Sequence, residues 1–233
     1  MVTKRILCFA NSRKPGGRCV AGREILDSGQ LGQWIRPVSS RQDESVWTTE
    51  QQYHGNKGLP QVLDELKVPL LQANPHGCQT ENWVLDATKW WQKTGTAKWS
   101  IAASYAENSP VLFVNAGSSK KGSNNEIPLA QSETLPSSLT LIRVDEINVQ
   151  KFIYYEKVKL VGWFQYNGMG YGLDITDPVI ESEYHTKDDG YYAIGESLLC
   201  ISLSKPINKT NGDGLDYRYK LIAAVMPKPE EGA

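Results

Sequence analysis

The sequence predicts a mostly β protein built from two consecutive small β-barrels. Both halves of the 233-residue chain contain about five short runs rich in β-branched and aromatic residues, with glycine or proline between them. A segment rich in glycine, serine, asparagine and proline separates the halves. Short strands bounded by turn residues at regular spacing are typical of small barrels and sandwiches.

In the first half we expect strands at 4–9, 18–26, 33–38, 65–71 and 110–115. Helical patterns are few. The runs 85–95 and 97–108 predict a helical insertion in this half. Five strands with such an insertion favour an OB-like barrel, and a PUA-like barrel or a single β-sandwich are the alternatives.

In the second half we expect strands at 138–145, 157–166, 171–177, 197–204 and 217–226. Alternation is clearest within 157–166, where Lys157, Lys159 and Gln165 would face away from the apolar side. The loop 167–170 predicts a hairpin to the next strand. We place the domain boundary within 116–138, which gives a first barrel at 1–130 and a second at 137–233.

Composition indicates a packed globular protein, with 40% hydrophobic and 22% charged residues. No apolar run approaches the roughly 20 residues of a membrane helix, and the run 6–10 is too short for a signal peptide. We therefore expect a cytoplasmic protein with no membrane association. Four cysteines without close pairing predict free thiols in a reducing compartment.

Metal, cofactor and catalytic motifs are not evident. Among the histidines and cysteines, only His76 and Cys78 are neighbours in the sequence. Gly117 and Gly122 are spaced as in a P-loop, but Ser123 stands where that motif needs lysine. Glu81 is the best remaining candidate for a general base. We expect no cofactor, and a protein that is more a binder than an enzyme.

Charge is unevenly distributed along a chain with a formal net charge of −1. The first 41 residues hold eight basic residues against two acidic ones, whereas 174–189 is acidic. Within the first segment, NSRKPGGR (11–18) combines cations with glycines that allow a tight turn and close backbone approach to a phosphate. It predicts a phosphate-binding turn or, in the alternative, an ordinary solvated turn.

Further candidate ligand residues lie nearby in the first half. Alternation puts Trp34 and Arg36 on one face of a strand, where an indole can stack on a base. Gln79, Asn82 and Trp83 combine amides that can bind base edges with a second indole. Structural roles, such as an arginine–carboxylate pair or a helix cap, are the alternatives. The predicted nucleic-acid-binding residues are Asn11, Ser12, Arg13, Lys14, Arg18, Arg23, Trp34, Arg36, Gln79, Asn82 and Trp83.

The second half offers a candidate stacking patch around its hairpin. Its members are Phe164, Tyr166, Tyr171, Thr176 and Asp177. Aromatic residues at period two are usually core residues, which is the alternative. The acidic run beyond this patch would repel phosphates, so we expect this half to bind a protein partner or a nucleobase.

Several stretches spread across the chain resemble the bacterial dual OB-fold domain family. They are ILCFANSRKPGGRCVAG, GQWIRPVS, QTENWVLD, GLDITDP and the late pair LLCISLS and YKLIAAV. The resemblance implies two consecutive OB folds, nucleic-acid binding, and association with prokaryotic defence systems. Three hypotheses follow: a module for single-stranded or structured RNA or DNA, an enzyme acting on a nucleotide or modified base, and an adaptor for a protein of a defence complex.

Overall fold

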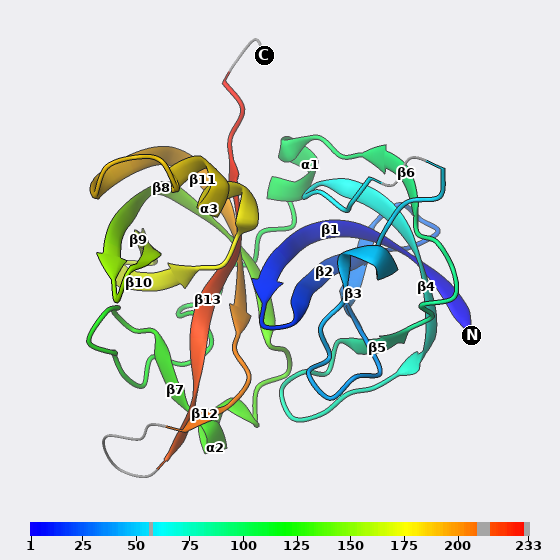
Figure 1. The fold of residues 1–233 in the computed structure, drawn as a ribbon, viewed down its shortest axis with the longest axis horizontal. Coiled ribbons are helices and arrows are strands. Elements are labelled where there is room, and N and C mark those ends of the chain that lie inside the picture. Colours follow the sequence, from blue (N-terminus) through cyan, green and yellow to red (C-terminus); the bar gives the residue numbers. More distant parts are fainter. Residues whose placement is uncertain (56–57, 209–214, 231–233) are drawn as a thin grey trace. The chain divides into compact units, whose positions relative to one another are not determined.

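The computed structural model describes residues 1–55, 58–208 and 215–230. The chain forms two compact units, Met1–Tyr105 and Ala106–Ala233. Each unit is built around its own β-sheet (Figure 1). No helix within the described residues is long and apolar enough to cross a membrane.

The first unit is a closed five-stranded barrel. Hydrogen bonds join its strands in the order β1-β2-β3-β5-β4, and β4 pairs with β1 to close the ring. Only the β3–β5 pairing among these is parallel. The strands are β1 (Val2–Lys14), β2 (Gly17–Ile25), β3 (Leu31–Val38), β4 (Asp64–Ala73) and β5 (Asn82–Leu85).

Alternating apolar residues of these strands fill the first barrel. Ile6, Val20, Ile35 and Leu66 are fully buried there, together with Trp91. A short 3₁₀ helix, η1 (Thr48–Glu50), lies between β3 and β4, β6 (Gln92–Thr96) adds to the β4 edge, and α1 (Trp99–Ala103) follows β6.

The second unit repeats the same closed arrangement. The strands β8 (Leu139–Tyr154), β9 (Lys157–Tyr166), β10 (Met169–Ile175), β11 (Gly190–Leu203) and β13 (Asp216–Pro227) pair as β10-β9-β8-β11-β13. A parallel β10–β13 pairing closes the ring. Helix α3 (Pro178–Tyr184) connects β10 to β11, and β7 (Glu126–Pro128), α2 (Leu129–Ser132) and β12 (Ile207–Asn208) complete the unit.

The prediction of two OB-like barrels is confirmed, because each unit has five strands in a closed ring with one parallel pairing. All five strands expected in the second half are present, as are the first four of the first half. The hairpin expected at 167–170 joins β9 to β10.

Two local predictions are wrong. Residues 85–95 do not form a helix: they contain the end of β5, a turn and the start of β6, because pairing with β4 overrides the local preference. Residues 110–115 form no strand, and the remaining strand of the first barrel is the much shorter β5. The helix expected at 97–108 is present in part, as α1.

The two units divide between Tyr105 and Ala106, earlier than the segment 116–138 in which we expected the boundary. Within that segment, β7 pairs with β13 and therefore belongs to the second sheet. Whether each unit folds by itself stays a prediction.

Candidate nucleic-acid interface

The basic hairpin of the first barrel has a carboxylate at its tip. Lys14 pairs with Gly17 across a two-residue turn, and Gly16 adopts a φ of +85° that favours glycine. A Cβ at Gly16 would lie 2.2 Å from Asp43 Oδ2, so the tip packs against the side chain of Asp43. A phosphate that approached the Gly16 backbone would meet this carboxylate.

Acidic residues accompany many of the cations in the first 41 residues. The ion pairs are Lys4–Glu24 (2.6 Å), Arg5–Glu65 (3.9 Å), Lys14–Glu44 (4.0 Å), Arg36–Glu81 (2.8 Å) and Arg41–Glu50 (2.7 Å). Arg41 also stacks on Trp47, with 3.9 Å from the guanidinium carbon to the ring centroid. The basic character of this segment is therefore largely compensated within the first unit.

Trp34 and Arg36 do not form an exposed ligand face, contrary to our expectation. Both side chains are buried, with 8% and 3% of their residue surfaces exposed. Trp34 packs edge-to-face on Phe9, 5.8 Å between ring centroids, and Arg23 lies 5.6 Å from its ring. The pairing of Arg36 with Glu81 is the structural alternative considered above.

The remaining first-barrel candidates lie in two places. Gln79 and Asn82 are buried beside Glu81, and Trp83 packs against the barrel core with Lys4 Nζ 4.6 Å from its ring. This group is brought near Arg36, because β5 pairs with β3.

On the β1–β2 hairpin, Asn11 donates to the Pro60 carbonyl (2.9 Å) and the buried Ser12 hydroxyl to that of Cys19 (3.4 Å). Arg13 is exposed, whereas Arg18 is half-buried and pairs through its backbone with Val46. A contact of these residues with nucleic acid stays a prediction.

The aromatic patch expected in the second barrel is part of its core. Phe164, Tyr166 and Tyr171 are buried, and the first and last of these stack with 5.6 Å between ring centroids. The Tyr171 hydroxyl reaches Asn115 Oδ1 (3.0 Å) and accepts from the Leu112 backbone N–H (3.1 Å).

Thr176 and Asp177 also have structural roles. The Thr176 hydroxyl donates to the Ile222 carbonyl (3.3 Å). The Asp177 carboxylate caps α3 by accepting from Val179 N–H (2.9 Å), and it accepts from Val225 N–H (3.0 Å). Burial raises the pKa of Asp177, although these backbone donors oppose the rise.

The outer face of β8, β9 and β10, here called the β8–β10 face, displays a different set of side chains. On β9 the residues that alternate with the core are Lys157, Lys159, Trp163 and Gln165 among others. Directly opposite on β8 lie Asn148, Gln150, Phe152 and Tyr154. Because opposed residues of paired strands share a face, these side chains form one polar and aromatic surface.

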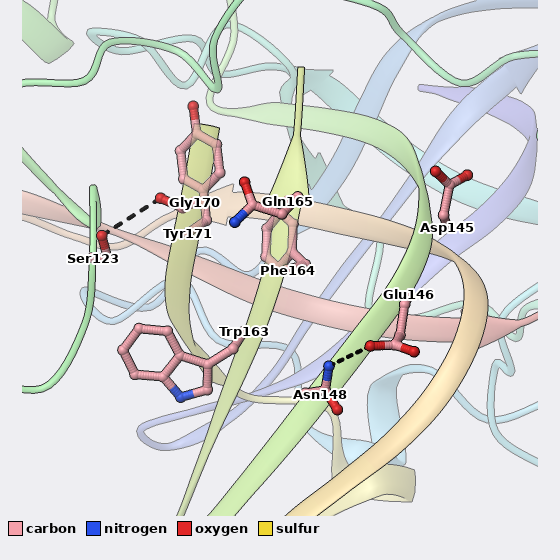
Figure 2. A pocket seen from close by; sticks show the side chains of 9 residues that line it. All are labelled: Ser123, Asp145, Glu146, Asn148, Trp163, Phe164, Gln165, Gly170 and Tyr171. Carbon is pink, nitrogen blue, oxygen red and sulfur yellow. Dashed lines mark hydrogen bonds between the residues drawn. The ribbon is translucent and has the colours of Figure 1, made fainter. Parts of the chain in front are cut away.

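A hollow of about 460 Å³ opens on this face (Figure 2). Its lining residues come from β8, β9, β10 and the loop before β7: Ser123, Asp145, Glu146, Asn148, Trp163, Phe164, Gln165, Gly170 and Tyr171. Figure 2 shows Ser123 bonded to the Gly170 carbonyl on one side and Asn148 bonded to Glu146 on the other. Among these described lining residues there are two carboxylates and no cation.

Trp163 is held in a fixed position beside the hollow. It faces Gly172 across the β9–β10 pair, where a Cβ would come within 2.5 Å of the indole ring. The indole N–H donates to Gln150 Oε1 (2.9 Å). Trp163 is half-buried, so part of its surface stays exposed beside the hollow.

The other end of the β8–β10 face is aromatic and basic. Tyr154 and Tyr155 meet edge-to-face at the tip of the β8–β9 hairpin, and Tyr155 is 82% exposed. Lys121 Nζ lies 3.1 Å from the Tyr154 ring centroid. Lys157 and Lys159 follow on β9, and neither has an ion pair among the described residues. The face thus runs from a lysine-rich hairpin to an acidic hollow.

A second ionisable group lies inside this barrel. Lys220 on β13 is fully buried, donates to Asn115 Oδ1 (2.9 Å) and lies 5.2 Å from the Tyr171 ring. Burial lowers the pKa of Lys220 to about 7. This side chain belongs to the interior network and not to the β8–β10 face.

The structure also shows the positions of the candidate metal ligands and of the candidate general base. The described residues contain no group of three or more histidine, cysteine, aspartate or glutamate side chains able to hold a metal ion, and His76 and Cys78 are therefore not part of such a group. Glu81, the candidate base, is buried against Arg36.

Sequence reasoning missed Trp163 although the signal was available. The alternation in 157–166 assigns Lys157, Lys159 and Gln165 to the outer face, and Trp163 has the same parity. The predicted patch instead took Phe164 and Tyr166, which alternate with Trp163 along β9. Two members of that patch, Phe164 and Tyr171, nevertheless line the hollow.

Comparison with known proteins gives one family match. The family model described as dual OB-containing domain matches residues 4–225. No curated protein and no solved structure matches the chain.

Proposed function

Because the chain belongs to the dual OB-containing domain family, we propose that it is a nucleic-acid-binding module whose second barrel holds a single strand on the β8–β10 face. The first three strands of this barrel are β8, β9 and β10. OB folds bind oligonucleotides on the face of their second and third strands and through the loop that joins the first two. The hollow, Trp163 and the β8–β9 hairpin occupy those positions.

The observation that carries the proposal is the fixed indole of Trp163 beside the hollow. Base-on-aromatic stacking contributes about 1–3 kcal/mol per base and accepts every base, because each base has a π-face. Tyr191 on β11 lies opposite Gln150, the residue that holds Trp163, and is 67% exposed. Tyr191 and the tyrosines of the hairpin tip supply further stacking surfaces on the same side of the barrel.

Lysines of the same face supply the charge for phosphates. Lys157 and Lys159 precede Trp163 on the same strand. At the usual rise per residue of a β-strand, the backbone of Lys159 is about 13 Å from that of Trp163. Lys121 lies beside Tyr154 at the hairpin. Bases in the hollow and phosphates along the lysines would keep the negative backbone away from Asp145 and Glu146.

The experiment is a titration of fluorescently labelled single-stranded 12-mers of DNA and RNA, of mixed sequence, with full-length protein. We expect Trp163→Ala to lower affinity about tenfold or more, the equivalent of one lost stacking interaction. Trp90→Ala is the matched control, because Trp90 is a half-exposed tryptophan of the first barrel. Wild-type protein that binds neither polymer, or a Trp163→Ala variant as tight as wild type, would contradict the proposal.

Assays on the same purified protein distinguish two alternative functions, an enzyme and a protein-binding adaptor. An enzyme acting on a nucleotide would turn over its substrate and lose this activity in Glu81→Gln. An adaptor would retain a protein partner in the absence of nucleic acid. The link to bacterial defence implied by the sequence resemblance stays a prediction.

A further inference from the structure

The polar lining of the hollow beside Trp163 contains two carboxylates, and Ser123, Asn148 and Gln165 add groups that both donate and accept hydrogen bonds. Asp145 and Glu146 each contribute a carboxylate, and both residues are exposed. The Asn148 amide nitrogen donates to Glu146 Oε1 (2.6 Å), which engages one of its two N–H groups and one oxygen of the carboxylate.

A β-bulge explains why two consecutive carboxylates reach the same surface. In a regular strand, neighbouring residues point to opposite faces. From Val144 to Ile147, β8 advances three residues while its partner β11 advances two, from Ser197 to Gly195. Val144 and Ile147 both remain in the core, and the two residues between them are both exposed. Bulges that redirect side chains are frequent next to binding sites.

Acceptors of this kind discriminate among the bases. Guanine presents two adjacent N–H donors, on N1 and on the exocyclic N2, which match the two oxygens of one carboxylate. On adenine and cytosine, the donor of the amino group is next to a ring nitrogen that is itself an acceptor. On uracil and thymine, a single N–H lies between two carbonyls. A carboxylate is therefore repelled by part of the edge of every base except guanine.

We propose that the hollow, which Trp163 lines together with Asp145 and Glu146, selects guanine by accepting its N1–H and N2–H on one of these carboxylates. This inference rests on the proposed function and adds the identity of the base. The indole of Trp163 in the lining also favours a purine, because a purine offers a larger stacking area on an indole than a pyrimidine does. The charge of the hollow is also consistent, because it disfavours a phosphate and favours a ligand edge that carries donors.

The test measures the affinity of full-length protein for four 12-mers that differ only at one central nucleotide, G, A, C or T, in a background of thymidines. We expect the guanine-containing strand to bind at least tenfold more tightly than the other three. The double variant Asp145→Asn/Glu146→Gln should lose this preference, measured as the ratio of its affinities for the guanine-containing and all-thymidine strands, and its affinity for the all-thymidine strand should rise, since two negative charges are removed.

The matched control is Glu183→Gln/Asp188→Asn, which removes two acidic charges from the same barrel outside the hollow. It should keep the guanine preference, and thermal melting should show both double variants folded. Equal affinity for all four strands would overturn guanine selection and leave nucleic-acid binding intact. Binding of no strand would overturn both proposals. Tight binding of an arginine-rich peptide that depends on Asp145 and Glu146, without guanine preference, would assign the hollow to a cationic protein segment instead.

Discussion

The indole of Trp163 lies across Gly172, its partner on β10, so closely that a Cβ at position 172 would come within 2.5 Å of the ring. This contact fixes the indole from behind, and the bond to Gln150 fixes its edge. The candidate site therefore has an aromatic surface that is already positioned before a ligand arrives, which reduces the ordering cost of binding.

Substitution of Gly172 by alanine should displace Trp163. Overpacking of this kind costs about 1–3 kcal/mol of folding free energy, and we expect single-strand affinity to fall about as far as in Trp163→Ala. The matched control is Gly170→Ala, where the new methyl group would meet only the Gln165 side chain, with Nε2 at 3.4 Å. Chemical unfolding and oligonucleotide titration check the two effects, and equal affinities of both variants would argue against a positioned indole.

The salt dependence of binding should identify which barrel meets the phosphates. For single strands, the slope of log K against log salt concentration changes by about 0.7 for each phosphate that the protein neutralises. The variant Lys157→Ala/Lys159→Ala removes two cations and should therefore reduce this slope by about 1.4. The triple variant Arg13→Ala/Lys14→Ala/Arg18→Ala should change it less, because Asp43 and Glu44 lie beside that hairpin. A larger change in the triple variant would assign the phosphates to the first barrel.

Removal of one partner from the Arg36–Glu81 pair should destabilise the first barrel. Both side chains are buried, and the loss of either leaves an uncompensated charge, which costs about 3–5 kcal/mol. We expect Glu81→Ala to lower the urea midpoint strongly. Arg36→Met/Glu81→Leu should recover much of the loss, because the double substitution removes both charges. Full stability of Glu81→Ala would show that the pair is unimportant for folding.

Lys220 should make stability rise with pH. Its pKa is about 7 in the folded protein against an ordinary value of 10.5, so between these values the unfolded chain binds one more proton. Stability should therefore increase by about 1.4 kcal/mol per pH unit above pH 7 from this group alone. The measurement is the difference in unfolding free energy between wild type and Lys220→Met at about pH 7 and about pH 8.5. A pH-independent difference would contradict a neutral buried lysine.

Fragments should test the division of the chain. We expect 106–233 to fold and to retain single-strand binding, since the hollow and the lysines belong to this unit. The shorter fragment 137–233 lacks β7, Asn115 and Ser123, and should be less stable. Circular dichroism melting and oligonucleotide titration compare the two. An unfolded 106–233 would show that the second unit needs the first.

Most of the architecture follows from local patterns in the sequence. Alternation and turn residues predicted nine of the ten barrel strands, because a half-buried strand needs a period of two and a tight turn needs glycine, asparagine or proline. The exception is β5, whose four residues are too few to show a period and which is defined by its parallel pairing with β3.

The membership of the candidate site depends instead on tertiary contacts. The cations of 1–41 resemble a binding surface in the sequence, yet Glu44, Glu65 and Glu81 come from later strands and loops to pair with them. Conversely, the position of Trp163 in the candidate site depends on contacts with Gly172 on β10 and Gln150 on β8. The two carboxylates of the site, Asp145 and Glu146, lie together at a bulge in the β8–β11 pairing. Charge compensation and cavities arise from residues distant in sequence, so local patterns cannot specify them, whereas strand periodicity is local and can be read directly.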